Sequence, residues 1–169
     1  DLRKQLTRIT QELGVETRFD YNGAGDLLEL TDPAGNETAY DYDELGRPTE
    51  VAEPLGKTTS YSYDDVGNLL EEQDPVNALQ YSYDDADRLT EIGEGPAVLR
   101  EYAYDNADRM VEAVDAQGDA IELSYDDDDQ ITAIDDGRGM EADFTYNARG
   151  LLASQSDERG TITYGYDEL

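Results

Sequence analysis

Aromatic residues recur in pairs along this chain, with one small or polar residue between the two rings. In residues 58–63 the two rings alternate with threonine and serine. This period of two is typical of a strand that buries one face. The residues between the rings are small or polar in every copy: Asp20, Asp41, Ser62, Ser82, Ala103, Ser124, Thr145 and Gly165. The pattern therefore predicts strands with the rings on one face and small groups on the other.

The second ring of each pair is a tyrosine that is followed by Asp or Asn. These anchor tyrosines follow one another at intervals of 20 or 21 residues: Tyr21, Tyr42, Tyr63, Tyr83, Tyr104, Tyr125, Tyr146 and Tyr166. Two positions before them stand Phe19, Tyr40, Tyr61, Tyr81, Tyr102, Leu123, Phe144 and Tyr164, and these two columns hold every aromatic residue of the chain. We therefore predict one array of repeats over residues 1–169, with partial units at both ends.

Each repeat contains two turn signals. Four residues after the anchor stand Gly25, Gly46, Gly67, Asp87, Asp108, Asp129 and Gly150. Glycine and aspartate share a tolerance for left-handed backbone, so this column predicts positive φ. A second turn follows fourteen residues after the anchor, at Gly35, Gly56, Asn77, Gly118, Gly139 and Gly160. Two turns per repeat predict two strands of five to seven residues, that is, one β-hairpin.

The second strand of each hairpin leaves one point open. Its apolar residues stand six and nine positions after the anchor, as in Leu27 and Leu30 or Ile131 and Ile134. The two offsets differ in parity, so a regular strand cannot place both residues on one face. Either a bulge or burial on both faces is required. The predicted fold is all-β: tandem antiparallel hairpins in one long, twisted and curved sheet.

The columns together resemble the YD repeat of Rhs-family proteins. Residues 61–69 (YSYDDVGNL) and 40–47 (YDYDELGR) carry the motif most closely. In that family, similar hairpins lie side by side in a sheet that spirals into a hollow shell. The shell of bacterial polymorphic toxins encloses a C-terminal toxin, and animal teneurins have a similar barrel. The Asp-Pro self-cleavage motif of the family is missing, since Asp32–Pro33 and Asp74–Pro75 belong to repeat turns.

Composition excludes several classes of protein. Cysteine and histidine are absent, which excludes disulfides, thiolate sites and histidine-dependent catalysis. The net charge of −30 repels phosphate backbones, so we expect no nucleic-acid partner. No apolar run is long enough to span a membrane, and no signal segment opens the chain. Because the chain begins at Asp1 rather than Met, we expect it to be a piece of a longer protein.

Three groups of residues could carry chemistry. The run 126–129 consists of four aspartates, which suits Ca²⁺, but diffuse cation binding is the simpler interpretation. Arg47, Arg88 and Arg109 share one column and either bind anions or pair with the neighbouring aspartates. The tyrosine columns either pack between hairpins or stack on sugars. We expect no cofactor, no catalytic residue and no specific metal site.

The predicted function is that of a structural scaffold rather than an enzyme. The resemblance implies a section of the shell of a secreted or surface protein, with an enclosed C-terminal effector of the same parent chain as its partner. Unpaired terminal strands also favour end-to-end self-association. The alternative is a cell-surface adhesion module that binds glycan or a partner protein. The residues expected to hold the repeats together are Tyr40, Tyr42, Tyr61, Tyr63, Tyr81, Tyr83, Tyr102 and Tyr104, with Gly25, Gly46, Gly67 and Gly150 at the turns.

The spread of the charge leads to a first prediction. Acidic residues are distributed over all repeats rather than collected in a tail, and arginine outnumbers lysine. Such a uniform acidic coat suits a halophilic protein, because salt at ~1 M shortens the Debye length to about 3 Å. Dialysis to ~10 mM salt should therefore unfold the chain by self-repulsion, as followed by far-UV circular dichroism. A cooperative folded state at low salt would contradict the halophilic assignment.

Overall fold

The fold is all-β, as the repeat pattern predicts. The computed structural model describes residues 5–139 and 141–167, which form sixteen strands and two single turns of 3-10 helix, η1 (Glu12–Gly14) and η2 (Pro54–Gly56). The strands are antiparallel, and each lies beside its neighbours in sequence within one open sheet. Contacts group them into two compact units, Asp1–Tyr81 and Ser82–Leu169. In the described residues no helix has the length and apolar character that a membrane span requires.

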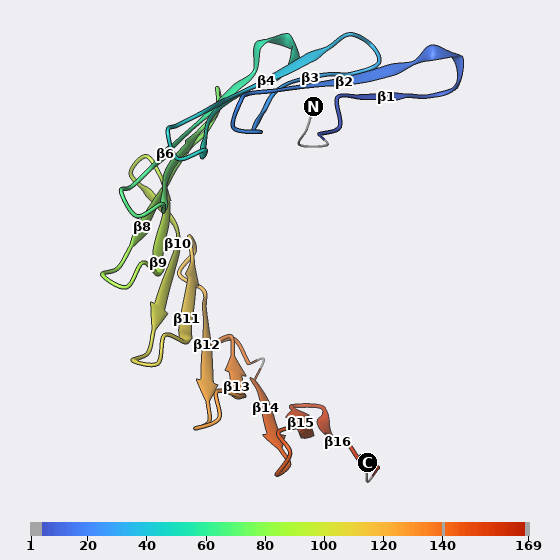
Figure 1. Ribbon diagram of the computed structural model, residues 1–169. Coiled ribbons are helices and arrows are strands. Elements are labelled where there is room, and N and C mark those ends of the chain that lie inside the picture. Colours follow the sequence, from blue (N-terminus) through green and yellow to red (C-terminus); the bar gives the residue numbers. More distant parts are fainter. Residues whose placement is uncertain (1–4, 140, 168–169) are drawn as a thin grey trace. The chain divides into compact units, whose positions relative to one another are not determined.

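The strands in the first unit run in sequence order from β1 to most of β8. Within this unit they form a single layer, shown in blue to green in Figure 1. Their bounds are β1 (Arg8–Thr10), β2 (Glu16–Tyr21), β3 (Leu27–Thr31), β4 (Glu37–Tyr42), β5 (Pro48–Ala52), β6 (Thr58–Tyr63), β7 (Leu69–Gln73) and β8 (Ala78–Tyr83).

The second unit continues the same pattern from the last two residues of β8. It is likewise a single layer of hairpins, drawn in yellow to red in Figure 1. Its strands are β9 (Leu89–Glu94), β10 (Ala97–Tyr104), β11 (Met110–Asp115), β12 (Ala120–Tyr125), β13 (Ile131–Asp135), β14 (Glu141–Tyr146), β15 (Leu152–Asp157) and β16 (Gly160–Thr163).

The loops that follow the anchor tyrosines share one construction. In the loop after Tyr83, the Asp84 backbone N–H donates to the Arg88 carbonyl (3.0 Å), and the Asp84 carboxylate accepts the Ala86 and Arg88 N–H groups (2.9 and 3.0 Å). This is a short turn closed by a left-handed residue, Asp87, whose φ is 60°. The positive φ predicted for that column is confirmed at Gly25, Gly46, Gly67, Asp87, Asp108, Asp129 and Gly150.

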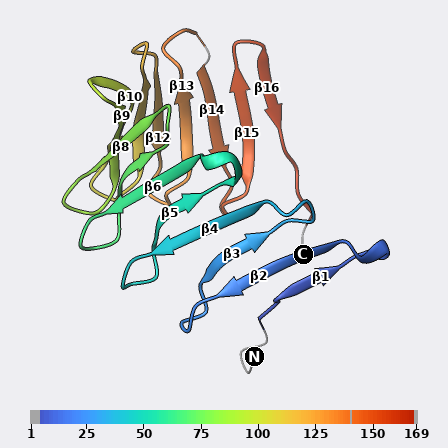
Figure 2. The same ribbon diagram turned by 90° about the horizontal axis from the view of Figure 1, so that it is seen from above.

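Successive loops leave each unit on opposite sides, so each unit has two rims (Figure 2). We call the side that carries the loops after the anchor tyrosines the anchor rim. The other side, with loops such as 32–36 and 115–119, is the opposite rim. On this side too an aspartate caps the turn in several loops: the Asp32 carboxylate accepts the Ala34 and Asn36 N–H groups (2.7 and 2.8 Å).

A β-bulge settles the question that the apolar offsets left open. In the first hairpin, Tyr21 lies opposite Leu27 and Asp20 lies opposite Glu29, so Leu28 is an extra residue. The extra residue shifts the pleat by one position, which brings offsets six and nine to the same face as the rings. The same irregularity recurs with Thr49, Leu70, Val111, Thr132 and Ala153 as the extra residues.

Each unit therefore has two chemically different faces. The tyrosine face carries both ring columns and most of the apolar residues opposite them, such as Val51 opposite Tyr40. The acidic face carries the residues between the rings, and carboxylates lie directly opposite one another there. These opposed pairs are Asp20 with Glu29, Asp41 with Glu50, Glu91 with Glu101, Glu112 with Glu122, and Glu122 with Asp135. No hydrophobic side chain of the described residues is buried, so neither face is covered by a second layer.

The left-handed turn residue leads to a second prediction. Gly46 has φ of 79°, and an added Cβ would meet only a side-chain oxygen at 3.9 Å, so backbone strain alone decides the outcome. Gly46→Ala should lower the free energy of unfolding by about 1–2 kcal/mol. Gly46→Asn should lower it less, since asparagine tolerates this conformation. If urea titrations gave the two variants the same loss in free energy of unfolding, left-handed backbone strain at Gly46 would be contradicted as the cause.

Candidate functional site

The anchor tyrosines connect successive hairpins through their hydroxyl groups. The hydroxyl of Tyr104 donates to the Leu89 carbonyl (2.9 Å), and that of Tyr125 donates to the Met110 carbonyl (2.7 Å). In both cases the acceptor lies fifteen residues earlier, in the preceding hairpin. The same bond joins Tyr21 to Leu6 (3.0 Å), Tyr42 to Leu27 (2.9 Å) and Tyr146 to Ile131 (2.8 Å). Each of these rings is thus fixed to its neighbour as well as to its own strand.

An arginine of the preceding hairpin covers the face of the same ring. The Arg88 guanidinium lies 4.8 Å from the centre of the Tyr104 ring, within the range of a cation–π contact. Its Nη1 donates to the Asp105 carbonyl (3.1 Å) and to the Asp108 carboxylate (2.7 Å) in the next loop. Its Nε donates to Asp84 of its own loop (2.8 Å). One side chain therefore joins two consecutive loops and a ring.

This arrangement, which we call the arginine–tyrosine bridge, repeats along the anchor rim. Arg109 lies 4.7 Å from the Tyr125 ring and donates to the Asp126 carbonyl (2.9 Å) and the Asp129 carboxylate (2.8 Å). Arg47 lies 4.7 Å from the Tyr63 ring and donates to the Asp64 carbonyl (3.0 Å). Pairing of the arginine column with the aspartate column is thus confirmed. These guanidinium groups are engaged within the sheet, which leaves no arginine ladder for anions.

Glutamine forms a shorter version of the bridge where arginine is missing. Gln130 Nε2 donates to the Gly150 carbonyl of the next loop (2.8 Å), and Gln5 Nε2 donates to the Gly25 carbonyl (2.9 Å). These bonds preserve the link between consecutive loops. They lack both the positive charge and the ion pairs of arginine.

Protonation equilibria in the bridge follow from these contacts. The pKa of Asp84 is lowered, first by the side-chain hydrogen bond from Arg88, and that of Asp105 is lowered, first by the Arg109 backbone N–H. Both carboxylates are therefore held in their charged form. The pKa values of Tyr42, Tyr61 and Tyr63 are raised, chiefly because partial burial disfavours the phenolate. These three rings are held neutral.

The structure places the predicted repeat residues in rows rather than in one site. Within the first unit, Tyr40 and Tyr42 lie opposite Val51 and Pro48 on the tyrosine face. Tyr61 and Tyr63 occupy the equivalent places one hairpin further, and Tyr81 ends the unit's inner column. In the second unit Tyr83 is the first anchor, while Tyr102 and Tyr104 lie opposite Ala113 and Met110. Gly25, Gly46, Gly67 and Gly150 all occupy left-handed turn positions.

The aspartate run 126–129 does not assemble a metal site. Asp126 caps its own turn by accepting the Asp128 and Gln130 N–H groups (both 2.9 Å), and Asp129 pairs with Arg109 (2.8 Å). Among residues 5–139 and 141–167, no group of three or more metal-ligating side chains is placed to hold an ion. Within this run, the Asp126 carboxylate serves the turn and the Asp129 carboxylate serves the bridge.

Family comparisons agree with this architecture. Residues 73–169 match the model described as Teneurin YD-shell, and residues 1–37, 21–58 and 42–78 match the model described as RHS Repeat. The chain belongs to the RHS/YD-shell family. Among curated protein sequences, none matches it. The two family models meet near β7 and β8 and together account for both units of the YD array.

Solved structures show the same fold at low sequence identity. The crystal structure of TcdB2-TccC3-Cdc42 matches 88% of this chain with a TM-score of 0.67 and 19% identity, and TcdB2-TccC3 matches 91% with a TM-score of 0.67 and 18% identity. TcdB2-TccC3-TEV matches 88% with a TM-score of 0.66 and 19% identity. The matched region covers only 9–10% of those chains, so this YD array corresponds to about a tenth of each.

Two features of the YD bridge were not anticipated from the sequence. The reach of arginine into the following hairpin was missed, because its column also holds Asp26, Asn68 and Leu151. The hydroxyl bond of the anchor ring was missed as well, although the sequence carries a signal for it. The anchor column is tyrosine in all eight copies, whereas the inner column accepts Phe19, Phe144 and Leu123. Tyrosine differs from phenylalanine only by its hydroxyl group. An anchor column that never accepts phenylalanine therefore indicates that the hydroxyl is required.

The hydroxyl bond generates a third prediction. Tyr125→Phe removes the bond to the Met110 carbonyl and leaves the ring in place, so it should lower the free energy of unfolding by about 0.5–1.5 kcal/mol. Tyr102→Phe is the matched control, because phenylalanine occupies that column naturally, and its effect should stay within about 0.5 kcal/mol. If both variants lost the same free energy of unfolding in urea titrations, the anchor hydroxyl would contribute no more to stability than the hydroxyl of the inner column.

Proposed function

We propose that this array is a non-catalytic structural scaffold, a stretch of wall in the shell of a secreted or surface-displayed RHS/YD protein. The observation that carries the proposal is the combination of a single-layer sheet with a bridge that repeats between hairpins. An enzyme gathers different side chains at one place, whereas this chain repeats the same side chains along its length. Such repetition suits a continuous surface, and we propose that residues 1–169 form one uninterrupted array.

We further propose that the wall encloses a C-terminal effector of the parent chain and that its tyrosine face is directed inward. The tyrosine face is mostly uncharged, with half-buried rings and apolar side chains. The acidic face carries carboxylates in directly opposed pairs, which repel one another unless water and counterions reach them. The acidic face is therefore the better outer surface, and its need for counterions fits a protein that works at high salt.

The rival function is adhesion through the same rings. The half-buried tyrosines could stack on sugars if their face were open to solvent. Two observations favour the wall: three anchor rings, Tyr63, Tyr104 and Tyr125, are already covered by arginine, and burial raises the pKa of Tyr42, Tyr61 and Tyr63. A sugar platform needs ring faces that are free.

Small-angle scattering in ~2 M KCl, a salt level at which charge repulsion is screened, tests the wall. A compact globule of this length has a radius of gyration of about 15 Å. We expect a clearly larger, flattened particle that is β-rich by circular dichroism. A globule near the compact value would mean that the hairpins cover their own tyrosine face, which contradicts the wall.

A glycan titration separates the wall from the adhesive module. The chain contains no tryptophan, so its fluorescence reports tyrosine alone. Saturable quenching by sugars that is lost in the Tyr40→Ala/Tyr61→Ala variant would favour adhesion. We expect no saturable change.

A further inference from the structure

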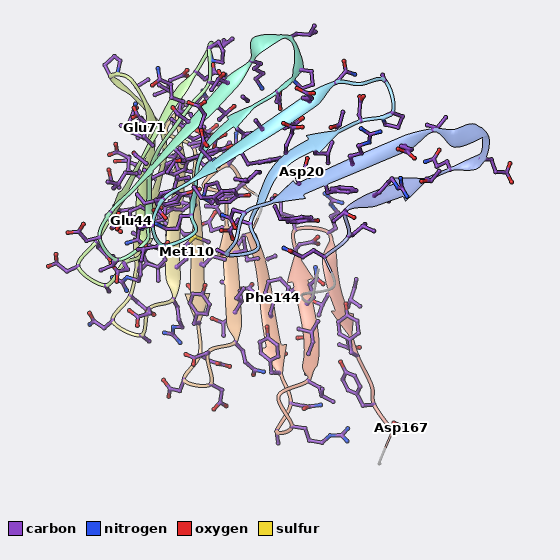
Figure 3. The ribbon with its side chains drawn as sticks, turned by 45° about the horizontal axis from the view of Figure 1, so that its top comes forward. Asp20, Glu44, Glu71, Met110, Phe144 and Asp167 are labelled. Atoms are coloured by element: carbon purple, nitrogen blue, oxygen red, sulfur yellow. The ribbon has the colours of Figure 1, made fainter. Side chains whose placement is uncertain are left out.

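One joint between hairpins lacks the donor that other joints have. Along the anchor rim, a side chain of one hairpin donates a hydrogen bond to a carbonyl of the following anchor loop, and these donors are Gln5, Arg47, Arg88, Arg109, Gln130 and Arg149. Asp26 stands in the arginine column before loop 43–47, the loop that Glu44 marks in Figure 3. It is the only carboxylate in that column, and a carboxylate accepts hydrogen bonds but does not donate them.

The Asp26 carboxylate faces the next loop where another joint places an N–H group. Its Oδ1 lies 3.9 Å from the point that a Cβ of Gly46 would occupy, and Arg47 Nη1 lies 3.9 Å from the same point above Gly67. From that position the guanidinium donates to a carbonyl of its next loop (3.0 Å). The equivalent carbonyl in the first joint is that of Asp43. This joint therefore holds two acceptors and no side-chain donor between its loops.

The side chains around Asp26 do not supply the missing donor. Asn22 Nδ2 donates to Asp26 Oδ2 (2.9 Å), and no hydrogen bond from the described residues reaches Oδ1. Arg47, the cation of the facing loop, is engaged elsewhere. Its Nε donates to the Asp43 carboxylate (2.6 Å), and its guanidinium lies over the Tyr63 ring (4.7 Å). A charged acceptor is thus left to solvent at this joint.

The ring at this joint lacks a cation as well. A guanidinium lies over three anchor rings: Tyr63, Tyr104 and Tyr125. In the described residues, no arginine lies over the Tyr42 ring, although its hydroxyl makes the same bond as the other anchors, to the Leu27 carbonyl (2.9 Å). Burial is the main cause of the raised pKa of Tyr42, and the charge of Asp26 is the second, so the carboxylate lies within electrostatic reach of the ring.

We propose that the Asp26 carboxylate, the Asp43 carbonyl and the Tyr42 ring form a binding site for a guanidinium group from outside the chain. The repeat itself indicates this occupant, because three other joints hold a guanidinium among a carboxylate, a carbonyl and a ring. The planar fork donates to oxygen atoms while its face lies on an aromatic ring. An ammonium is a compact, strongly hydrated charge that does not stack in this way.

Two sources present this chemistry: an arginine side chain of a partner protein and a small free guanidine. The net charge of −30 attracts either of them to the chain, but attraction alone does not select a site. The selection comes from the missing donor and the uncovered ring at one joint. This site goes beyond the proposed wall function and does not depend on it.

The test is a titration of the whole chain with ethylguanidinium chloride at constant ionic strength in ~1 M KCl, where self-repulsion is screened. Proton–nitrogen correlation NMR spectra follow the amide signals of residues 22–26 and 43–47. We expect these signals to shift together and to saturate, with a Kd of roughly 1–30 mM for a probe of this size. Potassium is in large excess throughout, so saturation also shows that the site prefers guanidinium to K⁺.

Substitutions at Asp26 separate binding from folding. Asp26→Asn removes the charge and should weaken binding about tenfold or more, while the fold persists because Asn68 occupies the same column. Asp26→Arg supplies the guanidinium from within, so it should abolish binding and raise the urea midpoint of unfolding. Asp65→Asn and Asp65→Arg are the matched controls, because Asp65 is exposed in the next anchor loop and outside the joint. They change the charge equally and should leave binding unaltered, and Asp65→Arg should raise the midpoint less than Asp26→Arg.

Peptide titrations identify the source of the group. A capped glycine–arginine–glycine peptide presents the guanidinium as a protein side chain does. Saturable shifts of the same amide signals by this peptide would assign the site to a partner's arginine, and shifts by ethylguanidinium alone would assign it to a free guanidine. The capped glycine–lysine–glycine peptide should give no saturable shift.

Three results would overturn the proposal. The first is the absence of a saturable shift at residues 22–26 and 43–47. The second is equal weakening by Asp65→Asn and Asp26→Asn, which would mean diffuse attraction to the acidic coat. The third is equal binding of the lysine peptide. None of them bears on the wall function, which the scattering experiment tests.

Discussion

A sheet without a core depends on what joins each hairpin to the next, and here that is the arginine–tyrosine bridge. Single-layer sheets gain little from burial, and no hydrophobic side chain of the described residues is buried. Backbone hydrogen bonds join the strands and close individual loops such as 84–88. The guanidinium of Arg88 or Arg109 contacts its own loop, the next loop and the next ring. Charge-assisted bonds of this kind are the strong ones available at a solvated rim.

The bulge is the second constraint, because it gives the sheet two chemically different faces. Without the extra residue after offset six, Leu27 and Leu30 would point to opposite sides, and neither face would be consistently apolar. With it, rings and aliphatic groups share one face and carboxylates share the other. Most acidic residues of the strands are thereby kept off the tyrosine face, where Glu72, opposite Tyr61, is an exception. A wall with one apolar and one acidic surface follows from a single extra residue per hairpin.

The structural roles of several aspartates help to explain how the fold tolerates a net charge of −30. Several aspartates that look like surplus charge in the sequence have fixed tasks, as caps of turns or as partners of arginine. The pKa values of Asp84 and Asp105 are lowered by these bonds, so their charge contributes to the fold. The opposed carboxylate pairs of the acidic face have no such compensation within their pairs. Their mutual repulsion is the basis of the salt requirement that we propose.

The sequence by itself determined the repeat length, the hairpin and the left-handed turn column. These features are local, because turn geometry depends on a few neighbouring residues such as Asp84 to Arg88. The tertiary structure decided between a bulge and two-sided burial, since only strand register shows that Leu28 is unpaired. It alone showed that Arg88 reaches the Tyr104 ring of the next hairpin, because that contact joins residues sixteen positions apart. It also showed which apolar residues are most exposed, since Leu45 and Leu55 differ from strand leucines such as Leu27 only in where the loops place them.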